Sequence, residues 1–181
     1  MFVAPTEAID VIEHLKKTYN IDEKRIYATG FSMGSGKTWD LFQQYPKVFA
    51  GVAPCSALFP VKNNPFSVPL GDKMNYDVPV PIFYSGGEES PLPELPFQAD
   101  TCLERVQYVA QVNNLKTKFD VDFADRANWE NRIYGISGDR VEKVYDETRD
   151  CYLTVNYYDS EDGICRTAFA SVSGQQHECR H

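Results

Sequence analysis

The sequence predicts an α/β protein with a mainly parallel sheet. Segments with helical periodicity alternate with short apolar strands up to residue 113, and this alternation is typical of parallel strands joined by helices. Of the 181 residues, 43% are hydrophobic, which is sufficient for a core in one ordinary domain. The net charge of −8 comes from interspersed charges, so neither nucleic acid nor an anionic membrane is expected as a partner.

The first part of the chain contains six expected elements. In order, these are a helix at 7–19, a strand at 25–29, a helix at 32–45, a strand at 49–54, a strand at 78–84 and a helix at 99–113. Apolar residues three and four positions apart indicate the helices. Thr6 is the expected N-cap of the first helix, and Pro46 ends the second.

The last third of the chain has a different character. Residues 152–158 and 166–172 are rich in β-branched and aromatic side chains, and they flank Asp162-Gly163. An Asp-Gly pair between two such segments is a strong hairpin signal. We therefore expect residues 114–164 to be an insertion or hairpin region within one domain that spans residues 1–181.

The segment IYATGFSMGSGKTWD, residues 26–40, contains two overlapping motifs. The first is Gly36-Lys37-Thr38, the end of a phosphate-binding loop. Such a loop needs a further glycine five residues before Gly36, so that backbone N–H groups can surround the phosphates. That position is Phe31, which cannot readily adopt glycine conformations. A nucleotide-binding function is therefore disfavoured.

The second motif is Gly-x-Ser-x-Gly, formed by Gly30, Ser32 and Gly34. It lies between an expected strand and an expected helix, which is the context of a nucleophile elbow. Larger side chains at either glycine are expected to collide with the neighbouring strand and helix. The motif predicts Ser32 as the nucleophile and the Met33 N–H as a donor to an oxyanion hole.

Residues 20–57, NIDEKRIYATGFSMGSGKTWDLFQQYPKVFAGVAPCSA, resemble the elbow region of α/β-hydrolase-fold serine esterases of the polyhydroxybutyrate-depolymerase and feruloyl-esterase-like branch. The resemblance extends over residues 5–60 and is weaker at 78–98 and 165–178. It implies a three-layer sandwich, a catalytic triad without metal or cofactor, and hydrolysis of short acyl, aryl or feruloyl-type esters. No strands precede residue 25, so the domain is expected to be N-terminally incomplete.

A serine nucleophile needs a general base, and His177 is the candidate. It follows the last expected strand and the small-residue turn Ser173-Gly174, which agrees with the chain order serine, acid, histidine of this fold. His14 precedes the elbow and is expected at the surface. His181 is the terminal residue and is expected to be frayed.

The acid is expected after the strand that ends in YSGG. Aligning the strand end and Gly86 with the turn implied by the resemblance selects Glu89. The following proline would instead align the acid with Ser90, which cannot serve as one. Three other carboxylates stay open as alternatives: Glu88, Glu94 and Asp100.

The remaining features concern partners and compartment. The five cysteines include no CxxC pair, so a zinc site or redox dithiol is not expected. Free thiols in a cytoplasmic protein are the main expectation, with a Cys151–Cys165 hairpin bridge as the alternative; secretion is the alternative location if further sequence precedes Met1. No apolar run approaches the roughly 20 residues needed to span a bilayer.

The sequence leaves three candidate functions. The leading one is a serine esterase acting on a small-molecule ester. The others are a peptidase of the same fold and a catalytically impaired hydrolase-like module that binds a partner. Because the strand at 25–29 is expected to have a bare outer edge, the chain is also expected to form a homo-oligomer through that edge, or to pair there with a partner that supplies the missing strands.

Overall fold

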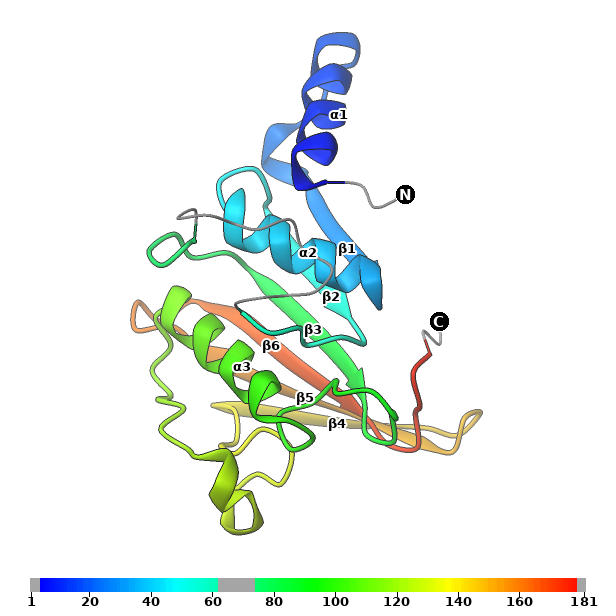
Figure 1. The fold of residues 1–181 in the computed structure, drawn as a ribbon, viewed down its shortest axis with the longest axis vertical. Coiled ribbons are helices and arrows are strands. Elements are labelled where there is room, and N and C mark those ends of the chain that lie inside the picture. The colour runs from blue at the N-terminus through cyan, green and yellow to red at the C-terminus, as the bar shows by residue number, and fades with distance from the viewer. Residues whose placement is uncertain (1–3, 62–73, 179–181) are drawn as a thin grey trace.

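The computed structural model describes residues 4–61 and 74–178, which form an α/β arrangement around one six-stranded mixed sheet (Figure 1). The strand order is β1-β2-β3-β6-β5-β4. The strands are β1 (Tyr27–Phe31), β2 (Gly51–Cys55), β3 (Ile82–Gly87), β4 (Arg140–Asp146), β5 (Cys151–Asp159) and β6 (Cys165–Val172). Neighbours from β1 to β6 are parallel, whereas β5 and β4 add an antiparallel extension.

The described helices are α1 (Pro5–Thr18), α2 (Met33–Gln44) and α3 (Asp100–Val112), with 3-10 turns η1 (Glu23–Arg25) and η2 (Phe123–Asn128). Helix α1 begins one residue before the expected N-cap: Ala4 is the cap, Pro5 is the first helical residue, and the Glu7 carboxylate accepts the Ala4 N–H at 2.7 Å. Proline suits this position because its missing N–H would have no helical partner. Among the described helices, none is long and apolar enough to cross a bilayer.

Strand β4 is the main element that the sequence did not predict. Its residues RVEKVYD do not alternate between apolar and polar, so the period of two that marks a half-buried strand is missing. All but the last of its residues are exposed. The strand forms because its backbone pairs with β5 over its whole length, from Arg140 opposite Tyr157 to Asp146 opposite Cys151.

Helices α2 and α3 cover one face of the sheet, and α1 packs against α2. Apolar residues of α1, α2 and α3 join a single core with Ile82 and Tyr84 of β3 and Phe169 of β6, and Figure 1 shows α2 and α3 on the same side of the strands. The opposite face has a hollow of about 400 Å³ lined mainly by strand residues, among them Phe83 and Ala168. Over the described residues the expected three-layer sandwich therefore has two layers.

Among the described residues, strand β1 is an edge strand with an unpaired backbone side. The Ile26 C=O accepts from Ala50 N–H, and the Ser32 N–H donates to Cys55 O. The backbone N–H and C=O groups of the even-numbered residues therefore point towards β2. Because backbone groups of successive residues point to opposite sides, the N–H and C=O groups of the alternate residues face outward, away from the sheet. Tyr27, one of these, is 67% exposed.

We predict that the chain self-associates through β1, since an open ladder beside exposed apolar side chains favours pairing with another chain. Tyr27→Lys places a charge on this edge and is expected to shift the sedimentation profile towards monomer. Val144→Lys is the matched control, because Val144 is a similarly exposed residue on β4, the opposite edge strand. A monomeric wild-type chain, or an equal effect of both substitutions, would contradict this prediction.

The described cysteines, Cys55, Cys102, Cys151 and Cys165, are free thiols. The alternative bridge between Cys151 and Cys165 is not formed. Each is the first residue of one of two antiparallel neighbouring strands, β5 and β6, so the two lie at opposite ends of the hairpin and exceed the reach of a disulfide. Cys179 lies outside the described residues.

Candidate active site

Ser32 lies between β1 and α2 in a conformation that serines rarely adopt. Its φ is 54° and its ψ is −113°, whereas residues with a Cβ strongly avoid positive φ. The bend is held on both sides, because the Ser32 N–H donates to Cys55 O at 3.0 Å and the Ser32 C=O accepts from Gly36 N–H at 3.1 Å. Such strain persists only where the surrounding structure maintains it, and it is the geometry expected of a nucleophile elbow.

Close packing requires only one of the two glycines of the motif. A Cβ at Gly30 would lie 2.3 Å from the Gly34 backbone, so α2 can follow β1 this tightly only if residue 30 has no side chain. A Cβ at Gly34 would meet nothing within 4 Å among the described residues. The expected collision at Gly34 is therefore not found, because β1 is the edge strand and no further strand of the described chain lies beside it.

His177 connects Ser32 to a carboxylate. Its Nε2 lies 2.8 Å from Ser32 Oγ, and its Nδ1 lies 2.6 Å from Glu94 Oε1. A carboxylate oxygen only accepts, so Nδ1 carries the proton and Nε2 of the neutral ring is an acceptor for the serine hydroxyl. The Phe31 ring lies 5.0 Å from the imidazole, centroid to centroid, and limits the movement of the ring on that side.

The Glu94 side chain is fully buried, and both of its oxygens are hydrogen-bonded. Oε1 contacts His177 and accepts from Ser90 Oγ at 2.7 Å, and Oε2 accepts from Gly87 N–H at 2.8 Å. A Cβ at Gly87 would lie 2.3 Å from Gln175 O. The end of β3 therefore lies directly against the loop that leads to His177, which brings the carboxylate and the imidazole together.

Two side chains, the buried Tyr84 and the half-buried Gln98, hold the backbone of residue 94. The Tyr84 hydroxyl donates to Glu94 O at 2.6 Å, and Gln98 Oε1 accepts the Glu94 N–H at 2.8 Å. Burial, and then the charge of Glu94, raise the pKa of Tyr84 well above its ordinary value. The phenol therefore stays protonated and keeps donating to this carbonyl at any ordinary working pH.

Glu89, the carboxylate selected from the sequence, is not the one beside His177. Its side chain is exposed, and its backbone N–H donates to Gln175 O at 3.0 Å. Glu88 instead binds Ser171 and Arg132, and Asp100 is an exposed residue at the start of α3. The alignment failed because the acid comes from the loop after the turn. A charged residue within the apolar, proline-rich segment PLPELP was the available signal.

Met33 is the first residue of α2, so its N–H has no acceptor within the helix and is free to bind a ligand oxygen beside Ser32. The residues of the rejected phosphate motif lie further along the same helix. There Thr38 Oγ1 donates to Gly34 O at 2.9 Å, and Lys37 pairs with Asp40 at 3.3 Å. These contacts are those of a regular helix rather than of a phosphate-binding loop.

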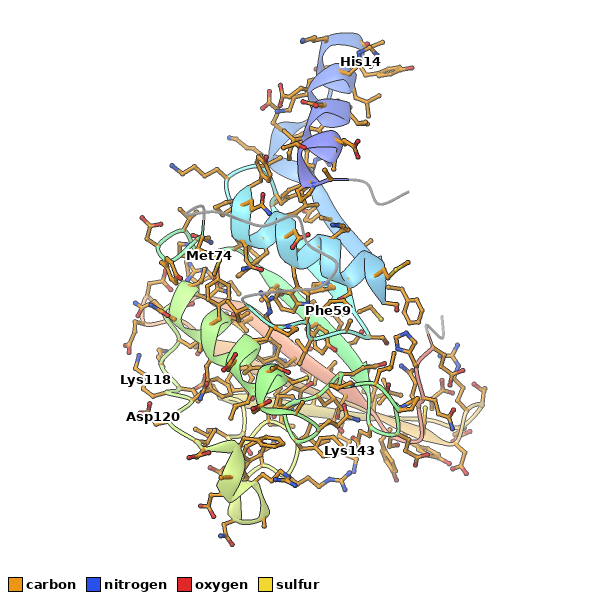
Figure 2. The ribbon with its side chains drawn as sticks, viewed as in Figure 1. His14, Phe59, Met74, Lys118, Asp120 and Lys143 are labelled. Carbon is orange, nitrogen blue, oxygen red and sulfur yellow. The ribbon has the colours of Figure 1, made fainter. Side chains whose placement is uncertain are left out.

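His14, the other histidine that the structure describes, does not join this cluster. His14 is exposed on α1, and Figure 2 shows it near the outer end of that helix, remote from the sheet. His181 lies outside the described residues. Within those residues, no group of three or more histidine, cysteine, aspartate or glutamate side chains could hold a metal ion.

The arrangement of hydroxyl, imidazole and carboxylate has a clear chemical capability. The imidazole can take the Ser32 proton as the hydroxyl attacks an electrophile, and the buried carboxylate stabilises the resulting imidazolium. The His177 side chain is 23% exposed, so a substrate can reach the site from solvent. Helix N-terminal N–H groups, including that of Met33, provide a positive dipole end beside the nucleophile.

Comparison with known proteins shows similarity to ester hydrolases over part of the chain. No family model matches. The chain is 39% identical over 77 residues to a bifunctional acetylxylan esterase/xylanase of Neocallimastix patriciarum, covering 42% of this chain and 10% of that protein. It is 41% identical over 44 residues to poly(3-hydroxyalkanoate) depolymerase C of Paucimonas lemoignei, covering 24% of this chain and 11% of that protein. The chain thus spans about a tenth of the length of these relatives.

Among solved structures, a thermostable esterase aligns with 68% of this chain and 30% of its own, at a TM-score of 0.41 and 24% identity.

Proposed function

We propose that the chain is a serine hydrolase that cleaves carboxylic esters through an acyl-enzyme on Ser32. The observation that carries this proposal is the position of His177, which bridges the Ser32 hydroxyl and the buried Glu94 carboxylate at 2.8 Å and 2.6 Å. The strained backbone at Ser32 and the partial similarity to esterases support the same conclusion.

The proposed reaction has two stages. In the first, Ser32 Oγ attacks the ester carbonyl carbon while His177 Nε2 takes the hydroxyl proton, and the Met33 N–H donates to the developing oxyanion. The tetrahedral intermediate then collapses, His177 returns the proton to the leaving alcohol, and the acyl group stays on Ser32. In the second, His177 activates a water that attacks the acyl-enzyme, and the carboxylic acid is released.

The proposed substrates are neutral small-molecule esters with short acyl, aryl or feruloyl-type groups. Phe31 and Met33, which flank Ser32, are both exposed apolar residues, and they suit an uncharged acyl or alcohol group. A peptidase of the same fold is distinguished by comparing p-nitrophenyl esters with peptide amides. Measurable turnover of the esters alone is the expected result.

A catalytically impaired module that binds a partner is the second candidate. The described residues before β1 form a helix and a 3-10 turn, and within the described residues the Met33 N–H at the start of α2 is the donor that the elbow supplies. Loss of one oxyanion-hole donor costs about 10²–10³ in rate in a well-studied protease, so turnover that relies on this donor alone is expected to be slow.

A fluorophosphonate probe tests the proposal without requiring fast turnover. The probe phosphonylates an activated serine hydroxyl, and the expected result is one label per chain that peptide mapping places on Ser32. Labelling should be suppressed by unfolding the protein before the probe is added. A folded chain in which Ser32 is not labelled would favour the impaired binding module over the hydrolase.

A further inference from the structure

The Glu94 carboxylate has a second side-chain partner beside His177. The Ser90 hydroxyl lies 2.7 Å from Glu94 Oε1, the oxygen that also contacts His177 Nδ1. Because that oxygen only accepts, the hydroxyl donates its proton to it. The Ser90 oxygen in turn accepts the Leu92 N–H at 3.1 Å. The Ser90 hydroxyl therefore both donates and accepts a hydrogen bond, and its proton points towards Glu94.

This contact matters because a glutamate carboxylate rotates easily. The terminal torsion of glutamate has a broad, shallow energy profile, so contacts on both oxygens are needed to fix the plane of the group. The Gly87 N–H holds Oε2. Besides His177, Ser90 is the contact on Oε1, and it lies in the segment after β3, whereas the imidazole comes from the segment after β6.

Hydrogen bonds within the loop between β3 and α3 fix the separation of Ser90 and Glu94. The side chain of Gln98 spans both residues: its Nε2 donates to Ser90 O at 3.3 Å, and its Oε1 accepts the Glu94 N–H at 2.8 Å. Ser90 is half-buried and Glu94 is fully buried. In this low-dielectric setting a hydrogen bond to a charged acceptor is stronger than in water.

We propose that Ser90 is a positioning residue for the reaction, and that its hydroxyl holds Glu94 Oε1 in line with the His177 Nδ1–H bond. The inference rests on the proposed function. Ser90 acts through Glu94 and undergoes no chemical change itself. Its loss should therefore affect the rate of the chemical steps and not the affinity for substrate.

The test compares Ser90→Ala with Ser90→Thr, which retains the hydroxyl, in the full chain. Ser90→Ala is expected to lower kcat for p-nitrophenyl acetate by about 10- to 100-fold, the range that small displacements of reacting groups produce, with KM little changed. Ser90→Thr should retain most of the wild-type kcat. Ser137→Ala is the matched control, because Ser137 is also half-buried but lies outside this network, and it should have wild-type kcat.

A second readout requires no turnover. The His177 Nδ1–H gives a downfield proton NMR signal when it donates to a carboxylate, and the signal is assigned by its loss in His177→Asn. Ser90→Ala should move or broaden it, and Ser90→Thr should preserve it. An unchanged signal together with wild-type kcat in Ser90→Ala would overturn the inference, as would equal losses in both Ser90 variants. If instead Ser32 is not labelled by the probe, the proposed function fails while the signal still tests the Ser90 contact.

Discussion

Ser32→Ala is expected to reduce ester hydrolysis to the background rate of the assay. Removing the serine of a serine–histidine–carboxylate arrangement lowers kcat by on the order of 10⁶-fold in a well-studied protease, because the acyl-enzyme can no longer form. The measurement is hydrolysis of p-nitrophenyl acetate by the purified variant, together with fluorophosphonate labelling. Both signals should disappear.

The fold should survive this substitution. Alanine keeps the Cβ, so the backbone at φ 54° is strained no more than in the wild type. The lost hydroxyl removes one partner of His177, whose side chain is 23% exposed, so water can take its place. The free energy of unfolding is therefore expected to change by less than about 0.5–1 kcal/mol, measured by urea denaturation.

Ser35→Ala is the matched control for Ser32→Ala. Ser35 lies one helical turn further on, where its hydroxyl is buried and donates to Ala57 O at 2.9 Å. Its loss should cost about 0.5–1.5 kcal/mol of stability, the net contribution of an ordinary hydrogen bond, because Ala57 O still accepts from Trp39 Nε1–H at 2.9 Å. Activity should be retained. Retained hydrolysis in Ser32→Ala would rule out the proposed nucleophile.

Glu94→Gln is expected to lower kcat by about 10⁴-fold, as the equivalent change of the acid does in another protease. A neutral amide cannot stabilise the imidazolium, and its NH₂ group can force His177 into the tautomer that does not accept the Ser32 proton. KM should change much less than kcat. The same assay on Glu89→Gln should give wild-type values, because that side chain is exposed.

Glu94→Gln also needs a check on folding, because the carboxylate is fully buried and hydrogen-bonded through both oxygens. Circular dichroism and the unfolding midpoint at the assay temperature separate loss of chemistry from loss of structure. Equal activities of the Glu94 and Glu89 variants, or a larger loss in Glu89→Gln, would overturn the assignment of the acid.

Much of the fold follows from local chemistry that can be read along the chain. Gly30 and the serine two residues later mark a strand-to-helix turn, and the structure places that turn between β1 and α2. Pro46 predicts the end of α2 near Tyr45, and the helix ends at Gln44. Asp162-Gly163 predicts the connection of the last two strands, which are β5 and β6. These features depend on residues that are close in sequence, so one sequence is enough to predict them.

The identity of His177 as the partner of Ser32 was also predictable, because few histidines compete for the role and chain order separates them. The two residues are nevertheless 145 positions apart, and what brings them together is the parallel pairing of β1, β2, β3 and β6. Parallel strands end on the same side of the sheet. The loop after β6 therefore returns beside the elbow.

Two features were decided only by tertiary structure: which carboxylate contacts His177, and which elements lie at the edge and on the faces of the sheet. Glu89 and Glu94 lie five residues apart, and local sequence cannot distinguish an exposed carboxylate from one that the loop folds inward onto Gly87 and Ser90. Strand β4 has no amphipathic pattern and exists through its pairing with β5. The open face beside Phe83 depends on which elements pack against the sheet. In each case the deciding contacts join segments distant in sequence, whereas the elbow at Ser32 is determined by the few residues that form it.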